Sequence, residues 1–282
     1  MQDRQTLLAM LEDKAGFCRK ETIRLIAIAK SGHYGSVFSA AELFSVLYYH
    51  VLRYDPARPD WPDRDRFILS KGHAAVGLYP LLADVGFFDP ALLDTYTRLG
   101  SPFGDHPDMR LIPGIDFSSG SLGHGLSVGV GMALAARVTG RSYRVYVLLG
   151  DGELDEGQVW EAAMSAAHYK LGNLVAIIDR NQVSVDGLTA EVMDPEPVAD
   201  KWAAFGWKVQ EVDGHDLNAL LDRFAALPNP ASAQPTVLIA HTVAGKPVSF
   251  MEHRFEWHLG YLAPEDQARA LAELGESGGG EP

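Results

Sequence analysis

Two apolar segments, each followed by polar residues, constrain the fold of this 282-residue chain more than any other feature. The run 143–149 leads directly into a Gly-Asp-Gly segment centred on Asp151, and the run 174–178 leads to Asn181. Residues 156–170 between them are typical of one crossover helix. Strand, helix and strand in this order predict a parallel βαβ unit. We therefore expect Asp151 and Asn181 to lie side by side where the two strands end.

This pair suits a diphosphate that is bound through a divalent cation. Asp151 would repel a phosphate unless a metal lay between them, and Mg²⁺ takes roughly six oxygen ligands. We assign as ligands the Asp151 carboxylate, the Asn181 amide oxygen and the Val183 carbonyl, leaving two phosphate oxygens and one water. Gly150 and Gly152 would let the backbone approach closely. A Gly-Asp-Gly segment alone can also be a simple strand-to-helix turn, so Asn181 is what favours the metal site.

Alternating strands and helices over the whole chain predict an α/β fold with a doubly wound, mostly parallel sheet flanked by helices. We expect one domain at 1–274 and a Gly-rich, disordered tail at 275–282. A capping box of Ser39 and Glu42 should begin the second helix. Further strands are expected at 66–69, 208–212 and 236–241, and helices at 6–30 (in two pieces), 39–51, 126–138, 198–205 and 215–227.

Charge and composition exclude several classes of function. A formal net charge of −13 argues against nucleic-acid binding. We find no apolar run of membrane-span length and no signal peptide. The one cysteine, Cys18, precludes an internal disulfide and is typical of a reducing compartment. We therefore expect a cytoplasmic protein without nucleic-acid or membrane partners, in which Cys18 is a buried apolar residue.

Three histidines lie in glycine-containing loops. His33 is in Ser-Gly-His-Tyr-Gly, His73 in Ser-Lys-Gly-His-Ala and His106 in Gly-Asp-His-Pro. They lack the short, fixed spacing of a zinc site, so we expect no metal ligation by histidine. A glycine-rich turn at 119–125 precedes a helix of small residues, which could pack closely against a neighbour or a cofactor ring. From the residues alone, each histidine could be structural or functional.

The Gly-Asp-Gly segment with an Asn at this interval resembles the thiamine diphosphate signature. GDGELDEGQVWEA, SKGHA, GSLG and the Trp-His pair at 257–258 resemble transketolases, over about 25–258. The resemblance covers only the amino-terminal, diphosphate-binding part of a transketolase, which continues into a pyrimidine-binding and a third domain.

This resemblance implies a half-enzyme that uses thiamine diphosphate with Mg²⁺ or Ca²⁺. Such a chain would be the amino-terminal subunit of a transketolase that moves a two-carbon ketol unit from a ketose (phosphate) to an aldose. A carboxy-terminal subunit would supply the pyrimidine domain and its activating glutamate. Two copies of each chain would form a heterotetramer that acts on sugar phosphates.

The resemblance also implies roles for individual residues. His33 and His106 would bind the donor ketose, while His73 and His258 would contact the cofactor or a reacting oxygen. The implied catalytic set is His33, His106 and His258, and the implied cofactor set is His73, Gly120, Leu122, Gly123, Gly150, Gly152, Glu153, Asn181 and His258. Glu156 and Glu161 would lie at a dimer interface, although both could equally be solvated residues near the start of a helix.

Several positions depart from the transketolase pattern. Tyr34 replaces the usual Pro, His124 the usual Gln and Ala244 the usual Lys, although Lys246 is nearby; Leu259-Gly260 replaces Gly-Lys. These departures leave room for a different sugar or a specialised acyl or ketol transfer. The alternatives are an α-type subunit of a 2-oxoacid dehydrogenase, which SKGHA and Trp-His disfavour, and a non-catalytic cofactor-binding subunit.

Overall fold

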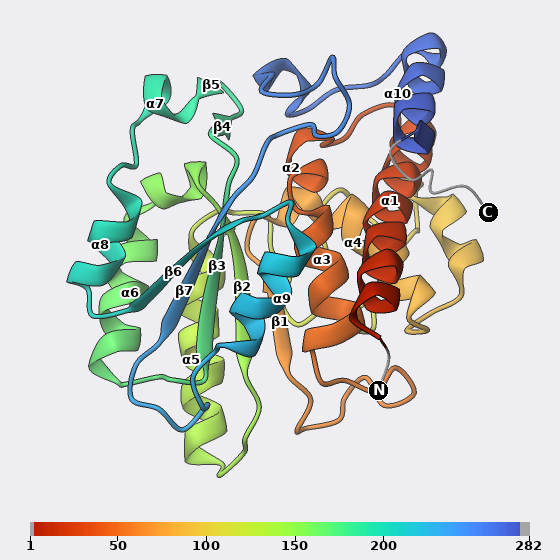
Figure 1. The fold of residues 1–282 in the computed structure, drawn as a ribbon. Helices are drawn as coiled ribbons and strands as arrows, with labels where there is room; N and C mark the ends of the chain where they lie inside the picture. Colours follow the sequence, from red (N-terminus) through yellow and green to blue (C-terminus); the bar gives the residue numbers. More distant parts are fainter. Residues whose placement is uncertain (1–2, 277–282) are drawn as a thin grey trace.

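The central sheet has five strands, all parallel, in the order β1-β2-β3-β7-β6 (Figure 1). The computed structural model describes residues 3–276. The strands are β1 (Arg66–Leu69), β2 (Val145–Gly150), β3 (Leu174–Arg180), β6 (Lys208–Asp213) and β7 (Thr236–His241). The predicted strands and the parallel α/β fold are therefore confirmed.

Helices cover both faces of this sheet (Figure 1). Tyr146 and Leu148 of β2 point into one core, while Val145, Val147 and Leu149 point into the other. Burial on both faces explains why the strands are continuous apolar runs. One side has α1 (Arg4–Ala29), α2 (Gly35–Phe38), α3 (Ala41–Val46), α4 (Ala75–Asp84), α9 (Leu217–Ala225) and α10 (Pro264–Glu276); the other has α5 (His124–Val138), α6 (Gly157–His168) and α8 (Val198–Ala204).

The first helix is continuous, so the prediction of two helical pieces at 6–30 was wrong. Charged residues in the middle of this segment interrupt the apolar pattern of the sequence, and this interruption predicts a break in the helix. Leu11, Ala15, Cys18 and Thr22 nevertheless continue one buried stripe through that stretch at helical spacing. Cys18 is buried, as predicted.

The predicted helix at 39–51 is instead α3 followed by the π-helix η1 (Leu47–Val51). Ser39 is not its N-cap, because the Ser39 hydroxyl donates to Asp179 and the Glu42 carboxylate accepts from Arg19 and His215. The predicted capping box was therefore wrong. Both side chains that would have formed the capping box instead bind residues from other parts of the chain.

Short elements complete the loops near the ends of the strands. The β4–β5 hairpin and α7 follow β3, and none of these was predicted. Helix α10 extends to Glu276, two residues into the predicted tail, and residues 277–282 of that tail lie outside the described residues. In the described part of the chain, no helix combines the length and apolarity that crossing a membrane requires. The short elements are β4 (Val183–Ser184), β5 (Gly187–Leu188), α7 (Thr189–Val192), η2 (Gly72–Ala74), η3 (Pro90–Thr95), η4 (Gly152–Asp155) and η5 (Phe255–Trp257).

Two glycines of α5 test how closely this helix packs on the sheet. A Cβ atom at Gly129 would lie 2.7 Å from Val147 Cγ2, whereas one at Gly131 would have no atom within 4 Å. We predict that Gly131→Ala raises the free energy of unfolding by up to about 1 kcal/mol through helix propensity. Gly129→Ala should lower it, because overpacking costs about 1–3 kcal/mol. Urea denaturation of both variants measures this, and equal effects would contradict the close packing.

Candidate functional site

The carboxyl ends of β1, β2, β3 and β7 meet at one edge of the sheet, and the loops that follow them build the site. Gly150 of β2 pairs in register with Asp179 of β3. Asp151 is 2% exposed, and its Oδ2 accepts a hydrogen bond of 2.6 Å from the Gln182 backbone N–H. The loops that carry Asp151 and Asn181 are thus tied together, and the predicted juxtaposition is confirmed.

A buried carboxylate that sequence reasoning missed lies beneath this pair. Asp179 is fully buried and accepts hydrogen bonds from the side chains of Ser39, Lys71, Asn181 and Thr242. The Lys71 ammonium, 1% exposed, forms the ion pair with Asp179 and also donates to the Ser36 carbonyl. The sequence did contain a signal for this ion pair, because a carboxylate at the end of a buried parallel strand needs a cation to neutralise its charge.

Asp179 also sets the orientation of Asn181. The Asn181 Nδ2 donates to Asp179 Oδ2 at 3.1 Å and to Ser39 Oγ at 3.2 Å. Its amide oxygen therefore points the other way, where it accepts the Val183 N–H at 3.0 Å. This amide orientation follows from the hydrogen-bond network. The Asn181 oxygen thus faces away from Asp179 and toward the backbone of Val183.

The donor set fits a hard cation. Burial, then the neighbouring Asp179, raises the pKa of Asp151 to about 7, although backbone N–H groups and Lys71 oppose this. A cation beside Asp151 would stabilise its charged form. Carboxylate, amide and carbonyl oxygens are the ligands that Mg²⁺ and Ca²⁺ take. Residues 3–276 contain no group of three or more His, Cys, Asp or Glu arranged to hold a metal.

Three of the predicted histidines meet in one cluster. The ring centroids are 4.9 Å apart for His33 and His73, 5.5 Å for His33 and His258, and 5.1 Å for His73 and His258. His258 reaches this place because the chain after β7 folds back on the first loop. Gly32 and Gly260 exchange two backbone hydrogen bonds, of 3.0 and 2.9 Å.

The environment keeps two of these rings neutral at physiological pH. Burial is the main cause that lowers the pKa of His73 well below its ordinary value, and His33, His258 and Lys71 add to it. Burial, then His33 and Lys71, lowers the pKa of His258 to about 4. A neutral imidazole has one donor and one acceptor nitrogen, so each ring can give and take hydrogen bonds in the site.

His106 lies apart from the other three rings and is exposed. Its ring contacts the glycine turn, since a Cβ atom at Gly120 would lie 3.2 Å from the His106 ring carbons. The φ of Gly120 is +153° and that of Gly123 is +83°, the latter in the left-handed region that favours glycine. A Cβ atom at Gly123 would meet the Glu156 side chain at 2.7 Å. Leu122 between these glycines is partly exposed.

Glu153 connects the loops of the site to one another. Its carboxylate accepts from the Ser70 hydroxyl, from the Gly123 N–H at 2.8 Å and from the Gly150 N–H at 3.1 Å. Burial raises its pKa, while these hydrogen bonds oppose the rise. Both Glu153 oxygens thus bind protein groups in this structure. Glu156 and Glu161, by contrast, are exposed at the start and on the surface of α6.

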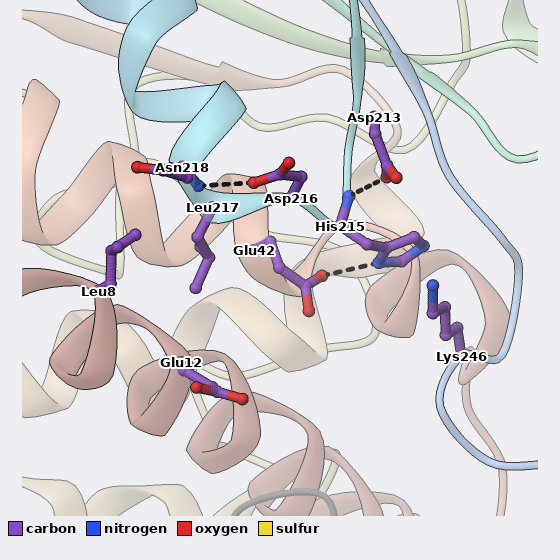
Figure 2. A pocket seen from close by; sticks show the side chains of 9 residues that line it. All are labelled: Leu8, Glu12, Glu42, Asp213, His215, Asp216, Leu217, Asn218 and Lys246. Atoms are coloured by element: carbon purple, nitrogen blue, oxygen red, sulfur yellow. Dashed lines mark hydrogen bonds and ion pairs between the residues drawn. The ribbon is translucent and has the colours of Figure 1, made fainter. Parts of the chain in front are cut away.

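Lys246 does not join the histidines. It lines a separate cavity of about 480 Å³, where Glu42 and His215 form a hydrogen bond of 3.1 Å (Figure 2). None of the four histidines, Asp151 or Asn181 lines this cavity. Ala244 is buried, 3.8 Å from the position that a Gly35 Cβ atom would take. Lys246 therefore does not replace, near the histidines, the cation that Ala244 lacks.

A carboxylate and an amide at the ends of adjacent parallel strands, beside clustered histidines, define an α/β protein of the class that binds ligands at the carboxyl edge of its sheet. Residues 13–277 match the family model described as "Transketolase, thiamine diphosphate binding domain". The chain therefore belongs to the transketolase family and carries its thiamine diphosphate-binding domain. The predicted resemblance to a transketolase-type transferase is confirmed.

The relatives that match this chain include separate transketolase subunits of similar length and a much longer transketolase. One subunit of the apulose-4-phosphate transketolase of Phocaeicola vulgatus is 43% identical over 258 residues, 92% of this chain and 91% of that protein. 6-Deoxy-6-sulfo-D-fructose transketolase subunit SqwG of a Clostridium species is 41% identical over 95% of this chain and 97% of that protein. Transketolase from Leishmania mexicana superposes with a TM-score of 0.87 at 32% identity over 94% of this chain. The chain spans only 41% of the length of that solved transketolase.

The buried Lys71–Asp179 pair yields a stability prediction. Lys71→Met leaves the Asp179 carboxylate buried without its cation, which should lower the free energy of unfolding by about 3–5 kcal/mol. The matched control is Lys14→Met, which breaks a more exposed pair with Asp84 and should cost about 1 kcal/mol or less. Urea denaturation measures both. A similar small loss in both variants would contradict the role of the buried pair.

The lowered pKa of His258 predicts a dependence of stability on pH. The unfolded chain takes up this proton near pH 6.5 and the folded chain near pH 4, so stability is lost as pH falls through that window. At about 1.4 kcal/mol for each pKa unit, His258 contributes at most about 3 kcal/mol, less because the ring is partly exposed. His258→Gln should reduce the difference in unfolding free energy between pH 7.5 and pH 5. An unchanged difference would contradict the assigned environment.

Proposed function

We propose that this chain works as the amino-terminal subunit of a thiamine diphosphate-dependent transketolase. It would transfer a two-carbon ketol unit from a ketose (phosphate) to an aldose acceptor. The observation that carries the proposal is the rim of Asp151 and Asn181 beside three clustered histidines, within a transketolase-family domain. Two relatives that match nearly end to end are named transketolase subunits, which supports a two-chain enzyme.

Asp151, Asn181 and the Val183 carbonyl would hold Mg²⁺ or Ca²⁺ against the diphosphate. When bound, thiamine diphosphate supplies the nucleophilic carbon that allows a carbon–carbon bond beside a carbonyl to break. Gly120, Leu122, Gly123, Gly150 and Gly152 would form the wall around it, because their small size or backbone groups permit close approach. Glu153 would act indirectly, by holding these loops together.

The histidines would handle protons and orient the sugar. His33 and His106 would bind hydroxyl and carbonyl groups of the donor ketose. His258 and His73, kept neutral by their surroundings, would donate hydrogen bonds to a reacting oxygen or the diphosphate without adding fixed charge.

A carboxy-terminal subunit would cover one face of this chain, and two copies of each would make a heterotetramer. Exposed apolar side chains on and after α5 and α6 support such a covered face: Val138 is 86%, Met164 51% and Tyr169 49% exposed. Glu156 and Glu161 would lie at the interface between paired sites. The two relatives' names concern different sugars, apulose 4-phosphate and 6-deoxy-6-sulfo-D-fructose, and so do not single out one substrate. We propose sugar phosphates as the substrate class. We further propose a cytoplasmic location and a single cofactor-binding domain at 1–274.

Reconstitution tests the proposal. The chain should bind thiamine diphosphate weakly and turn nothing over alone, and mixing with its partner subunit should restore tight binding and ketol transfer together. Asp151→Ala should abolish the metal-dependent binding while leaving the circular dichroism spectrum unchanged, because Asp151 lies at the edge of the core. Calorimetry measures the binding and analytical ultracentrifugation the heterotetramer.

Three outcomes would count against this proposal. Full activity from the chain alone would show that it is not a half-enzyme. Cofactor binding without turnover of any ketose would instead support a non-catalytic subunit. Unchanged calorimetric binding in Asp151→Ala would contradict the metal assignment.

His106 provides a prediction about substrate. His106→Ala should lower kcat/KM for the donor ketose by about 10-fold or more, since a group that faces the substrate acts after the cofactor is bound. The dissociation constant of thiamine diphosphate should change less than about twofold. Steady-state kinetics and calorimetry on the reconstituted enzyme measure the two effects. Equal losses would assign His106 to the cofactor instead.

A further inference from the structure

The carboxylate of Asp105 lies among the histidines of the site, and no role has yet been assigned to it. Its Oδ1 lies 3.5 Å from Nδ1 of His33, and its Oδ2 lies 3.9 Å from Nδ1 of His106. The Tyr96 hydroxyl donates to Oδ1 at 3.4 Å, from the end of η3. Asp105 thus lies between the two histidines that were assigned to the donor sugar.

The position of His33 makes this contact specific. Its Nδ1 atom is buried and has no hydrogen-bond partner within normal geometry, and the Asp105 carboxylate is the acidic group that it faces. The ring also contacts His73 and His258, at centroid distances of 4.9 and 5.5 Å. Hydrogen bonds of catalytic groups are often long before a ligand binds and tighten afterwards.

Asp105 is ionised at neutral pH. Burial acts to raise its pKa, but the contacts with His33, His106 and Tyr96 outweigh burial and lower the pKa below its usual value. An ionised carboxylate only accepts hydrogen bonds, so a ring nitrogen that faces it must carry the proton. In a neutral imidazole the other nitrogen, Nε2, is then an acceptor.

We propose that Asp105 is a positioning residue that fixes the Nδ1–H tautomer of His33 and so presents its Nε2 to the donor sugar as a hydrogen-bond acceptor. His33 then selects a hydroxyl group of the sugar and not a carbonyl, which has no hydrogen to give. The assignment to a sugar rests on the proposed function, whereas the tautomer does not.

The charged and titratable groups around His33 come from several segments. Asp105 faces the Nδ1 atom and itself contacts Tyr96 and His106, while His73 and His258 contact the ring. Lys71 lies near enough to lower the pKa of both His73 and His258. Asp105 is the carboxylate in this group, and because its removal also affects His106 and Tyr96, the decisive measurement follows the His33 nitrogens themselves.

Nitrogen NMR of the full chain labelled with ¹⁵N-histidine tests the tautomer without partner or cofactor. Comparison with His33→Gln assigns the signals. In the unmodified chain, Nδ1 of His33 should have the shift of a protonated nitrogen and Nε2 that of an unprotonated one. Asp105→Ala should shift both signals toward a mixture of tautomers, while Asp94→Ala, at an exposed carboxylate paired with Arg24, should change neither. A protonated Nε2 in the unmodified chain overturns the proposal, even if Asp105→Ala does not fold.

Kinetics of the reconstituted enzyme test the functional consequence. Asp105→Ala should lower kcat/KM for the donor ketose by about 10-fold, with less than about a twofold change in the dissociation constant of thiamine diphosphate. In a His33→Gln background, the same substitution should cost less than about twofold, because Asp105 acts through His33. An undiminished loss in that background would mean that Asp105 acts through His106 or contacts the sugar itself, and would overturn its positioning role on His33. An enzyme without ketol transfer would refute the proposed function but leave the NMR result standing.

Discussion

The buried carboxylate of Asp179 is the interaction on which the site depends. Its four side-chain partners come from the loop before α3, the loop after β1, the end of β3 and the end of β7. A charge at this depth is stable only when it is paired and fully hydrogen-bonded, so all four segments must assemble together. The orientation of the Asn181 amide follows from that assembly.

Close approach of backbone segments is the second requirement. The turn at 119–123 lies against the His106 ring and the Glu156 side chain, at distances that leave little room for a Cβ atom at Gly120 or Gly123. Glu153 then ties this turn to the ends of β1 and β2. This edge of the sheet is thereby built from loops whose positions depend on one another.

The histidine cluster adds chemistry to this edge. Three imidazoles within 5.5 Å of one another repel a common positive charge, and burial acts in the same direction. His73 and His258 therefore work as neutral hydrogen-bonding groups in this site. The chain belongs to the transketolase family, and neutral imidazoles are groups that can both give and take a proton.

The sequence by itself determined the parallel sheet and the pairing of Asp151 with Asn181, because apolar runs and the short βαβ connection obey local rules. Resemblance to transketolases further pointed to the glycine turn and to four histidines, three of which the structure brings together. Only the tertiary structure decided that Lys71 neutralises Asp179 and that Asp105 faces His33. It also decided that the Ser39 hydroxyl donates to Asp179 and does not cap a helix. These contacts join segments far apart in the chain or set the directions of side chains within a loop. No periodicity or spacing encodes them, since burial and the satisfaction of polar groups arise only after the segments have packed.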